Sequence, residues 1–327
     1  MAMLRLRELK CYYQTPRGVV QAVDGVSFEI RPNEVLGIAG ESGCGKSTLL
    51  KVLYDYIQPP LQIVSGSYEA DFPDGSGKVM TIGPGEIREH WWDFISYIPQ
   101  GSMSVLNPVI RIESQFFDAV PKSHPLKAKG KRAIRERVAG YLKELELPVE
   151  VLKSYPHQLS GGMKQRVLVA LGTFLHPQVV LADEPTTALD VVVQKGILLM
   201  LTELQQQMAN TLVVVSHDMG VHYQISDRLA IMYAGKLVEY GPTDAIFNYP
   251  AHPYTQMLIQ SLPRVGDRAQ RSGISGRPPN LIDPPAGCRF AARCPKVMDH
   301  CAHEAPALIQ IEPEHFVSCH LYGERAS

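Results

Sequence analysis

A glycine-rich nonapeptide at residues 40–48 constrains the fold of this chain more than any other segment. It reads Gly-Glu-Ser-Gly-Cys-Gly-Lys-Ser-Thr and fits the pattern G-x-x-x-x-G-K-S/T. The apolar residues at 34–39 predict a buried strand before it, and residues 48–53 predict the first turns of a helix after it. In such a unit, glycines let backbone N–H groups surround a phosphate chain, and the helix N-terminus adds partial positive charge.

The side chains of this loop suit a nucleotide. Lys46 can reach the β- and γ-phosphates, and the Ser47 hydroxyl can ligate Mg²⁺. A chance match in a glycine-rich loop is the alternative, and the strand–loop–helix context argues against it. The loop residues predicted to contact ATP are Gly40, Ser42, Gly43, Cys44, Gly45, Lys46, Ser47 and Thr48.

An acidic pair at the end of an apolar segment predicts the second half of the site. Residues 179–182 are typical of a buried parallel strand, and Asp183 and Glu184 follow them directly. Because adjacent residues of a strand point to opposite sides, the two carboxylates can take different tasks. Asp183 can reach Mg²⁺, directly or through water, and Glu184 can polarise the water that attacks the γ-phosphate. A polar strand end that caps the next helix is the alternative.

The order of predicted elements gives an α/β fold with a helical segment. Strands are predicted at 4–9, 19–30, 34–39, 94–98, 179–182, 212–216 and 229–233, and residues 65–90 predict loop and hairpin. Residues 100–158 predict helices, and residues 194–207 predict another helix between two strands. The apolar stripe of the helical segment is Ile134, Val138, Tyr141, Leu142 and Leu145. Prolines and cysteines gather after residue 250, so we place a boundary near 250 and a linker around 263–287.

Composition narrows the classes of function. The 327 residues are 45% hydrophobic and 20% charged, with a net charge of −1, which is ordinary for a soluble globular protein. The charge balance provides no basic field for nucleic acid. There is no run of about 18 or more apolar residues, so no membrane-spanning helix is predicted. The N-terminus lacks the apolar core of a secretion signal. We expect a cytosolic protein, unless another component carries it to a membrane.

Several short motifs together resemble one family. A Ser-Gly-Gly turn at 160–162 precedes a predicted helix, and alone it would be interpreted as a helix cap. Residues 40–48, 160–165 and 181–185, in this order and spacing, resemble the nucleotide-binding domain of an ABC transporter over about residues 1–250. The remaining motifs match as follows: Gln100 the Q-loop glutamine, Ala188, Leu189 and Asp190 the D-loop, His217 the switch histidine, and Tyr13 the adenine-stacking aromatic, with Tyr12 as competitor.

The resemblance implies a P-loop NTPase fold with a RecA-like core and a helical subdomain at about 100–158. Two such domains sandwich two ATP molecules head to tail, and hydrolysis separates them. The implied roles are ATP and Mg²⁺ binding by Lys46, Ser47, Asp183 and Gln100, catalysis by Glu184 with His217 at the γ-phosphate, and cover of the partner's ATP by Ser160, Gly161 and Gly162. Met163 departs from the commoner glutamine, but the backbone and serine contacts do not need that side chain.

The tail resembles a subfamily. Residues 252–255, with Leu258 and Pro263 after them, resemble the C-terminal extension of ATPase subunits from dipeptide and oligopeptide importers, and so do 97–100, 106–108 and 155–158. Residues 67–92 depart most from the subfamily pattern. The resemblance implies a second, related ATPase subunit, two permease subunits, an extracytoplasmic solute-binding protein, and a peripheral position at the cytoplasmic face of the inner membrane. Dipeptides, longer peptides, nickel chelates and oligosaccharides all remain open as cargo.

Two other classes of ABC protein fit less well. Exporters usually fuse membrane segments to the ATPase, and none is predicted here. Non-transport ABC proteins that act on ribosomes or DNA tend to carry two cassettes or a long coiled-coil insertion. This chain has one P-loop, one signature segment and no heptad run.

Four of the six cysteines gather near the end of the chain. Cys288, Cys294, Cys301 and Cys319 have the spacing C-x5-C-x6-C-x17-C. A cytosolic chain rarely keeps disulfides, which favours a metal site. Structural zinc usually uses closer cysteine pairs, whereas four thiolates from a looped segment can hold a 4Fe-4S cluster. The importer subfamily carries such a cluster, and these cysteines match its positions. Zinc and four unliganded thiols remain the alternatives. A metal would staple the small extension at 251–327.

Overall fold

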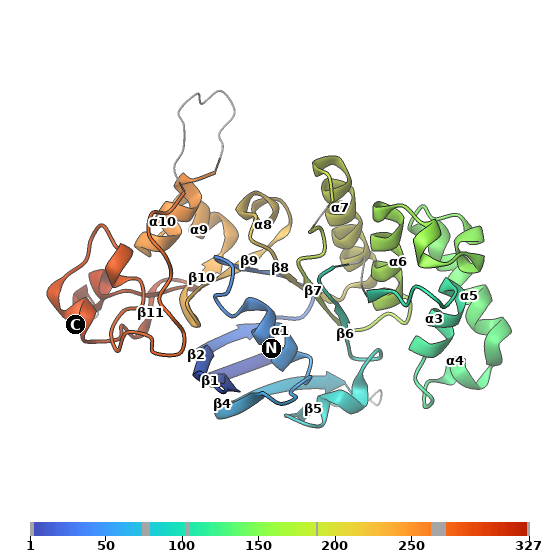
Figure 1. Cartoon of the computed structure of the whole chain (residues 1–327), viewed down its shortest axis with the longest axis horizontal. Helices are drawn as coiled ribbons and strands as arrows, with labels where there is room; N and C mark the ends of the chain where they lie inside the picture. The colour runs from blue at the N-terminus through green and yellow to red at the C-terminus, as the bar shows by residue number, and fades with distance from the viewer. Residues whose placement is uncertain (1–2, 74–78, 102–104, 188, 263–272, 326–327) are drawn as a thin grey trace. The chain divides into compact units, whose positions relative to one another are not determined.

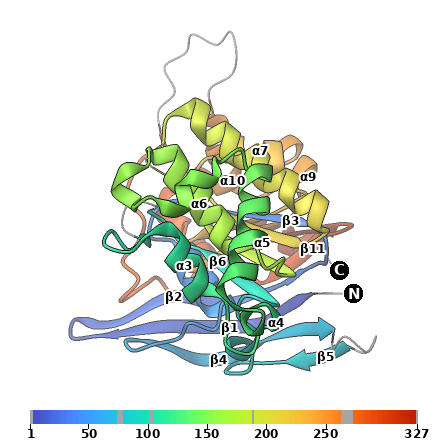
Figure 2. The same ribbon diagram turned by 90° about the vertical axis from the view of Figure 1, so that its right-hand side faces the viewer.

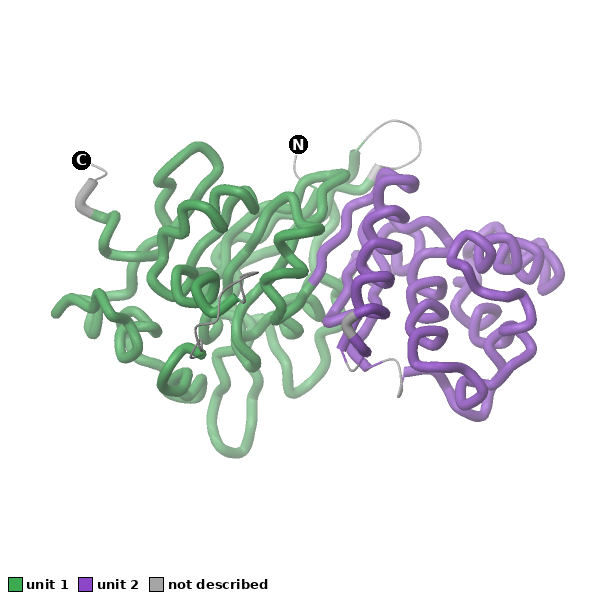
Figure 3. Tube along the Cα trace, turned by 90° about the horizontal axis from the view of Figure 1, so that it is seen from above, with its two compact units in different colours: residues 1–85, 215–327 green, residues 86–214 purple. Residues whose placement is uncertain are grey.

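The computed structural model describes residues 3–73, 79–101, 105–187, 189–262 and 273–325. The chain forms two compact units, one of residues 1–85 with 215–327 and one of residues 86–214 (Figure 3). Residues after 250 belong to the first unit, together with the N-terminal strands. The division into a nucleotide-binding domain at 1–250 and a C-terminal extension at 251–327 stays a prediction.

The first unit contains a four-stranded antiparallel sheet with the order β2-β1-β4-β5 (Figure 1). Its strands are β1 (Leu4–Thr15), β2 (Gly18–Ile30), β4 (Leu61–Pro73) and β5 (Val79–Ile82). The β1–β2 hairpin continues to the pair Thr15 and Gly18, so β1 is longer than the strand predicted at 4–9. The hairpin predicted within 65–90 is formed by β4 and β5.

A second sheet in this unit carries the phosphate-binding loop. Its strands run in the order β11 (Leu308–Glu312), β12 (His315–Ser318), β10 (Lys236–Pro242), β9 (Arg228–Tyr233) and β3 (Val35–Ala39). The strands β3 and β9 are parallel and fully buried, which confirms the buried strands predicted at 34–39 and 229–233. The loop after β3 leads into α1 (Lys46–Leu53).

The C-terminal extension shares the core of the first unit. Its strand β12 pairs with β10, and Phe290 packs against Tyr233 and Tyr254 with 1% of its surface exposed. Glu239 of β10 is fully buried and accepts hydrogen bonds from the backbone N–H groups of Ala251 and His252. The extension therefore needs no separate core. Besides α1, the described helices of this unit are α8 (Met219–Ile225), α9 (Thr243–Asn248) and α10 (Pro253–Gln260), with 3-10 turns at 291–293, 299–302 and 320–325.

The second unit combines parallel strands with the helical segment. The strands β6 (Ile95–Ile98) and β7 (Val179–Asp183) are parallel, and β8 (Thr211–Val215) follows β7 in the sheet order. The helices are α3 (Ile112–Ala119), α4 (Pro125–Ala128), α5 (Gly130–Glu144), α6 (Gly161–Thr173) and α7 (Val191–Met208), with 3-10 turns at 87–90, 149–153 and 156–158. Helix α5 contacts α3 and α6, and α6 contacts α7 (Figure 2). The predicted stripe from Ile134 to Leu145 is buried, as expected.

Candidate nucleotide-binding site

Two glycines of the phosphate-binding loop touch neighbouring backbone. Gly40 and Gly45 have φ angles of 147° and 106°, which L side chains rarely adopt. A Cβ on Gly40 would lie 2.1 Å from the carbonyl oxygen of Met232, and one on Gly45 would lie 2.0 Å from that of Ala22. The loop therefore rests directly on β9 and β2, and only glycine fits at these two positions.

The Lys46 ammonium lies inside the loop. Its Nζ donates to the carbonyl oxygens of Gly40 at 2.6 Å and Glu41 at 3.0 Å, and the residue is 5% exposed. The backbone of the loop therefore fixes the position of the ammonium, and its contact with phosphate stays a prediction. Burial raises the pKa of the neighbouring Cys44 thiol, so this cysteine is a neutral packing group.

The two candidate aromatic residues of β1 are adjacent, so their side chains point to opposite sides of the strand. The Tyr13 hydroxyl lies 3.2 Å from Thr48 Oγ1 in α1, whereas the Tyr12 hydroxyl donates to Asp24 at 2.7 Å. Tyr13 is therefore the residue that lies beside the phosphate-binding loop. This geometry favours Tyr13 over Tyr12 for the adenine, and the stacking itself stays a prediction.

The predicted switch histidine lies on the turn after β8. His217 is exposed and stands between Ser216 and Asp218, whose carboxylate caps α8. A second histidine, His222, is fully buried with Nε2 3.2 Å from the carbonyl oxygen of Ser216. Burial lowers the pKa of His222 to about 4, so it is neutral and supports the turn. The sequence analysis missed it, because a lone histidine in an amphipathic helix gives no signal.

In the second unit, both predicted carboxylates are held by specific partners. Asp183 is 3% exposed and accepts a hydrogen bond from the Tyr97 hydroxyl at 2.8 Å. Glu184 accepts from Gln100 Nε2 at 2.6 Å and from the Thr187 hydroxyl at 2.8 Å. Its φ of 45° is unusual for a residue with a side chain, and such strain concentrates at functional sites. The structure thus brings the predicted Q-loop glutamine and the predicted catalytic carboxylate into direct contact.

The Ser-Gly-Gly turn begins helix α6. Ser160 is exposed, and its Oγ accepts a hydrogen bond from the N–H of Met163 at 3.3 Å. A Cβ on Gly162 would lie 3.1 Å from Cγ1 of Val193 in α7. The missing side chain of Gly162 thus lets the turn approach that helix, whereas a Cβ on Gly161 would make only an ordinary contact with Leu189. Asp190 caps α7 by accepting from two backbone N–H groups, and Ala188 of the predicted D-loop lies outside the described residues.

The four C-terminal cysteines are buried or half-buried. Among the described residues, no three of Cys288, Cys294, Cys301 and Cys319 have their sulfur atoms within 4.8 Å of one another. Burial raises the pKa of Cys288 and Cys294, and raises that of Cys319 to about 11. Backbone N–H groups oppose this effect, and one of them, from Lys296, lies 3.4 Å from the Cys294 sulfur.

A tighter group of metal-binding side chains overlaps with the cysteines. The ligand atoms of His300, Cys301 and His320 all lie within 4.8 Å of one another. His320 Nε2 also lies 2.9 Å from the carbonyl oxygen of Glu304, a contact typical of histidines that bind a metal through the other nitrogen. The sequence analysis assigned no chemistry to His300.

The first unit has a glycine-rich loop between a buried strand and a helix. The second unit has a strand that ends in two hydrogen-bonded carboxylates. These are the parts of a P-loop ATPase cassette. Residues 23–187 match the family model for the ABC transporter, and residues 238–301 match the model for the oligopeptide/dipeptide transporter, C-terminal region. The chain therefore belongs to the ABC transporter family of ATP-binding proteins. Among the described residues, none of the helices is long and apolar enough to span a bilayer.

Individual relatives extend this likeness along the whole chain. The dipeptide transport ATP-binding protein DppD of Caldanaerobacter subterraneus is 40% identical, with 98% of each chain covered. The oligopeptide transport ATP-binding protein OppD of Salmonella typhimurium is 35% identical over 97% of this chain and 93% of its own. Among solved structures, the ATP-binding cassette MJ0796, in a dimeric post-hydrolysis state bound to ADP and Pi, matches with a TM-score of 0.61 at 26% identity. That match covers 74% of this chain and 99% of the cassette.

Proposed function

We propose that this chain is the ATP-hydrolysing subunit of an importer, and that it powers uptake of dipeptides or oligopeptides through separate permease subunits. The observation that carries this proposal is the full-length likeness to dipeptide and oligopeptide transport proteins, including the C-terminal region at 238–301. Importers of oligosaccharides or nickel chelates are the second candidate, because the ATPase never contacts the cargo. A non-transport ABC ATPase is a weaker alternative.

The first unit supplies the contacts to the nucleotide. Backbone N–H groups of residues 40–48 bind the phosphates, and Lys46 moves its ammonium from the loop carbonyls to the β- and γ-phosphates. The Ser47 hydroxyl would supply an oxygen ligand to Mg²⁺. Tyr13 stacks on the adenine, and His217 contacts the γ-phosphate.

The second unit supplies the catalytic carboxylate. Glu184, oriented by Gln100 and Thr187, accepts a proton from the attacking water. Asp183, directly or through water, and Gln100 would supply oxygen ligands to Mg²⁺, and hard oxygen donors of this kind suit that ion. When bound, Mg²⁺ neutralises charge on the phosphate oxygens.

Hydrolysis is coupled to movement through a partner subunit. Ser160, Gly161 and Gly162 cover the ATP that the partner holds, where the exposed N-terminus of α6 favours phosphate. A related cassette was solved as a dimer, which supports pairing of this kind. We propose a second, related ATPase chain as partner, two permeases that contact the helical lobe near 101–120, and an extracytoplasmic solute-binding protein. These partners hold the chain at the cytoplasmic face of the membrane.

We also propose that the extension holds a 4Fe-4S cluster on Cys288, Cys294, Cys301 and Cys319. The burial of these thiols and the Lys296 N–H group directed at the Cys294 sulfur support this assignment, because hydrogen bonds to the sulfurs are one of the means by which proteins tune such clusters. The group of His300, Cys301 and His320 supports zinc as the alternative.

The function is tested by uptake in cells that lack this chain. Complementation with the unaltered chain should restore uptake of a labelled dipeptide or oligopeptide, and Glu184→Gln should not. Labelled nickel chelates and oligosaccharides are measured in parallel. Restored uptake of one of those solutes instead of a peptide would replace the proposed cargo.

A further inference from the structure

Glu41, the second residue of the phosphate-binding loop, connects three parts of the first unit. Its carbonyl oxygen accepts from Lys46 Nζ at 3.0 Å. Its N–H donates to the Tyr254 hydroxyl at 2.9 Å. Its carboxylate accepts from both terminal nitrogens of Arg293, at 2.7 and 2.9 Å. One residue therefore joins the predicted phosphate-binding lysine to two side chains that follow residue 250.

Arg293 is firmly held in this position. Its side chain is 5% exposed and also donates to the Tyr233 hydroxyl at 3.1 Å and to the carbonyl oxygens of Ile274 and Ser275. Its guanidinium lies over the rings of Tyr233 and Phe290. The Glu41 carboxylate raises the pKa of Arg293. A guanidinium group that is fixed by several contacts orients a carboxylate through two parallel hydrogen bonds, which a flexible lysine cannot do.

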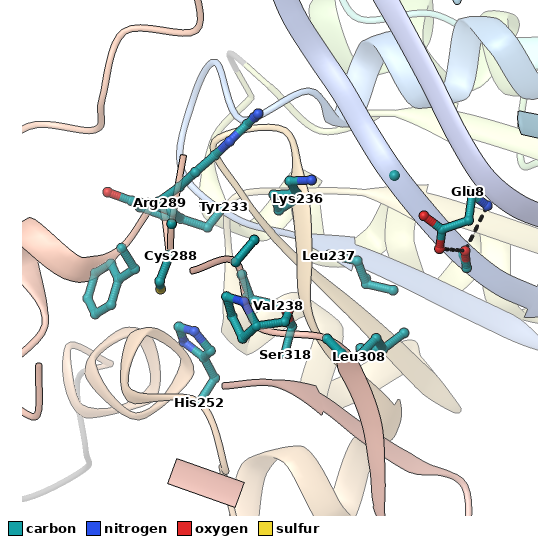
Figure 4. A pocket seen from close by; sticks show the side chains of 17 residues that line it. Glu8, Tyr233, Lys236, Leu237, Val238, His252, Cys288, Arg289, Leu308 and Ser318 are labelled. Carbon is teal, nitrogen blue, oxygen red and sulfur yellow. Dashed lines mark hydrogen bonds between the residues drawn. The ribbon is translucent and has the colours of Figure 1, made fainter. Parts of the chain in front are cut away.

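A second arginine of the same segment is connected to the loop indirectly. Arg289 donates to Asp24 at 2.5 Å and to the carbonyl oxygen of Ala234 at 2.5 Å. The next residue, Gly235, donates its N–H to the carbonyl oxygen of Cys44 in the loop. Arg289 and its neighbour Cys288 line a cavity of about 430 Å³. Figure 4 shows that their side chains point in different directions.

We propose that Arg293 is a positioning residue for ATP binding, which neutralises Glu41 and keeps this carboxylate from competing with phosphate for Lys46. The inference rests on the proposed role of Lys46. Without Arg293, the Glu41 carboxylate is an uncompensated negative charge, and the carbonyl group of the same residue contacts Lys46. That charge repels a triphosphate and attracts the ammonium, so affinity for ATP falls.

The test compares Arg293→Gln with the double variant Glu41→Gln/Arg293→Gln in the full chain. ATP affinity is measured by equilibrium titration, and KM and kcat are measured in the assembled transporter. Arg293→Gln should weaken ATP binding on the order of tenfold and raise KM, while kcat changes by less than about twofold. The double variant carries no unpaired charge and should recover most of the affinity.

A matched control comes from a second arginine–glutamate pair. Arg31 donates to both carboxylate oxygens of Glu314, at 3.1 and 2.6 Å, and the two side chains are 43% and 48% exposed. Arg31→Gln should leave ATP affinity unchanged. The inference is overturned if Arg293→Gln binds ATP like the unaltered chain, or if the double variant binds no better than Arg293→Gln. Absence of ATP binding by the unaltered chain would overturn the proposed function as well, so the two failures are distinguishable.

Discussion

Glu239 offers a quantitative test of how the C-terminal extension is attached. Its buried carboxylate accepts three hydrogen bonds, from the N–H groups of Ala251 and His252 at 2.8 and 2.9 Å and from His315 Nε2 at 2.8 Å. Glu239→Gln keeps one acceptor oxygen and replaces the other with a donor. At least one buried donor then faces an amide N–H and loses its partner.

The loss of a hydrogen bond to a charged acceptor costs about 1.5–3 kcal/mol. If that cost falls on local opening of the turn at 250–252, amide exchange there should accelerate by roughly 10- to 160-fold. Hydrogen exchange with mass-spectrometric readout of the peptide containing Ala251 and His252 measures this change. Glu312→Gln is the matched control, since Glu312 lies exposed on β11. Equal exchange in Glu239→Gln and the unaltered chain would refute the argument.

Three further outcomes are expected. Gly45→Ala should abolish ATP binding in equilibrium titration, because the new Cβ would lie 2.0 Å from a carbonyl oxygen. Gly43→Ala, at a φ of 78° but with open space around the added carbon, should reduce ATP affinity much less. Equal losses of affinity would contradict the steric argument. Burial lowers the pKa of His252 to about 3, so the unfolded state binds more protons and stability should fall as pH drops from about 6.5 toward 3, by about 1.4 kcal/mol per pH unit. His252→Asn, which can still cap α10, should flatten that slope in urea titrations, and an unchanged slope would count against it. Protein purified without oxygen should be brown, with about four irons per chain. Cys319→Ser should lose the iron, and Cys11→Ala should keep it. Colourless protein with stoichiometric zinc would contradict the 4Fe-4S assignment.

Local features of the fold were predictable from the sequence, because short-range chemistry determines them. The strand–loop–helix unit around Lys46 follows from apolar residues before the glycines and helix-forming residues after them. The stripe from Ile134 to Leu145 predicted a buried helix face, and α5 has it. The start of α7 at Val191 lies three residues before the predicted helix at 194–207, because Asp190 caps it.

Long-range features were not predictable in this way. The pairing of β12 with β10 joins Val317 to Glu239, and no periodicity specifies which strand edge accepts a distant hairpin. The pairs Arg293–Glu41 and Arg289–Asp24 are separated by 252 and 265 residues. Spacing also could not decide between Tyr12 and Tyr13, since only the direction of each side chain from β1 separates them.

ATP hydrolysis by the Glu184→Gln variant tests the central claim most directly. The variant and the unaltered chain are each assembled with their transporter partners, and ATP binding and phosphate release are measured on the same samples. The amide keeps the shape of the carboxylate but cannot accept a proton from water. We predict that ATP binding persists while turnover falls by on the order of a hundredfold or more. Equal rates of phosphate release would show that Glu184 is not the catalytic base and that this chain does not work as the proposed cassette.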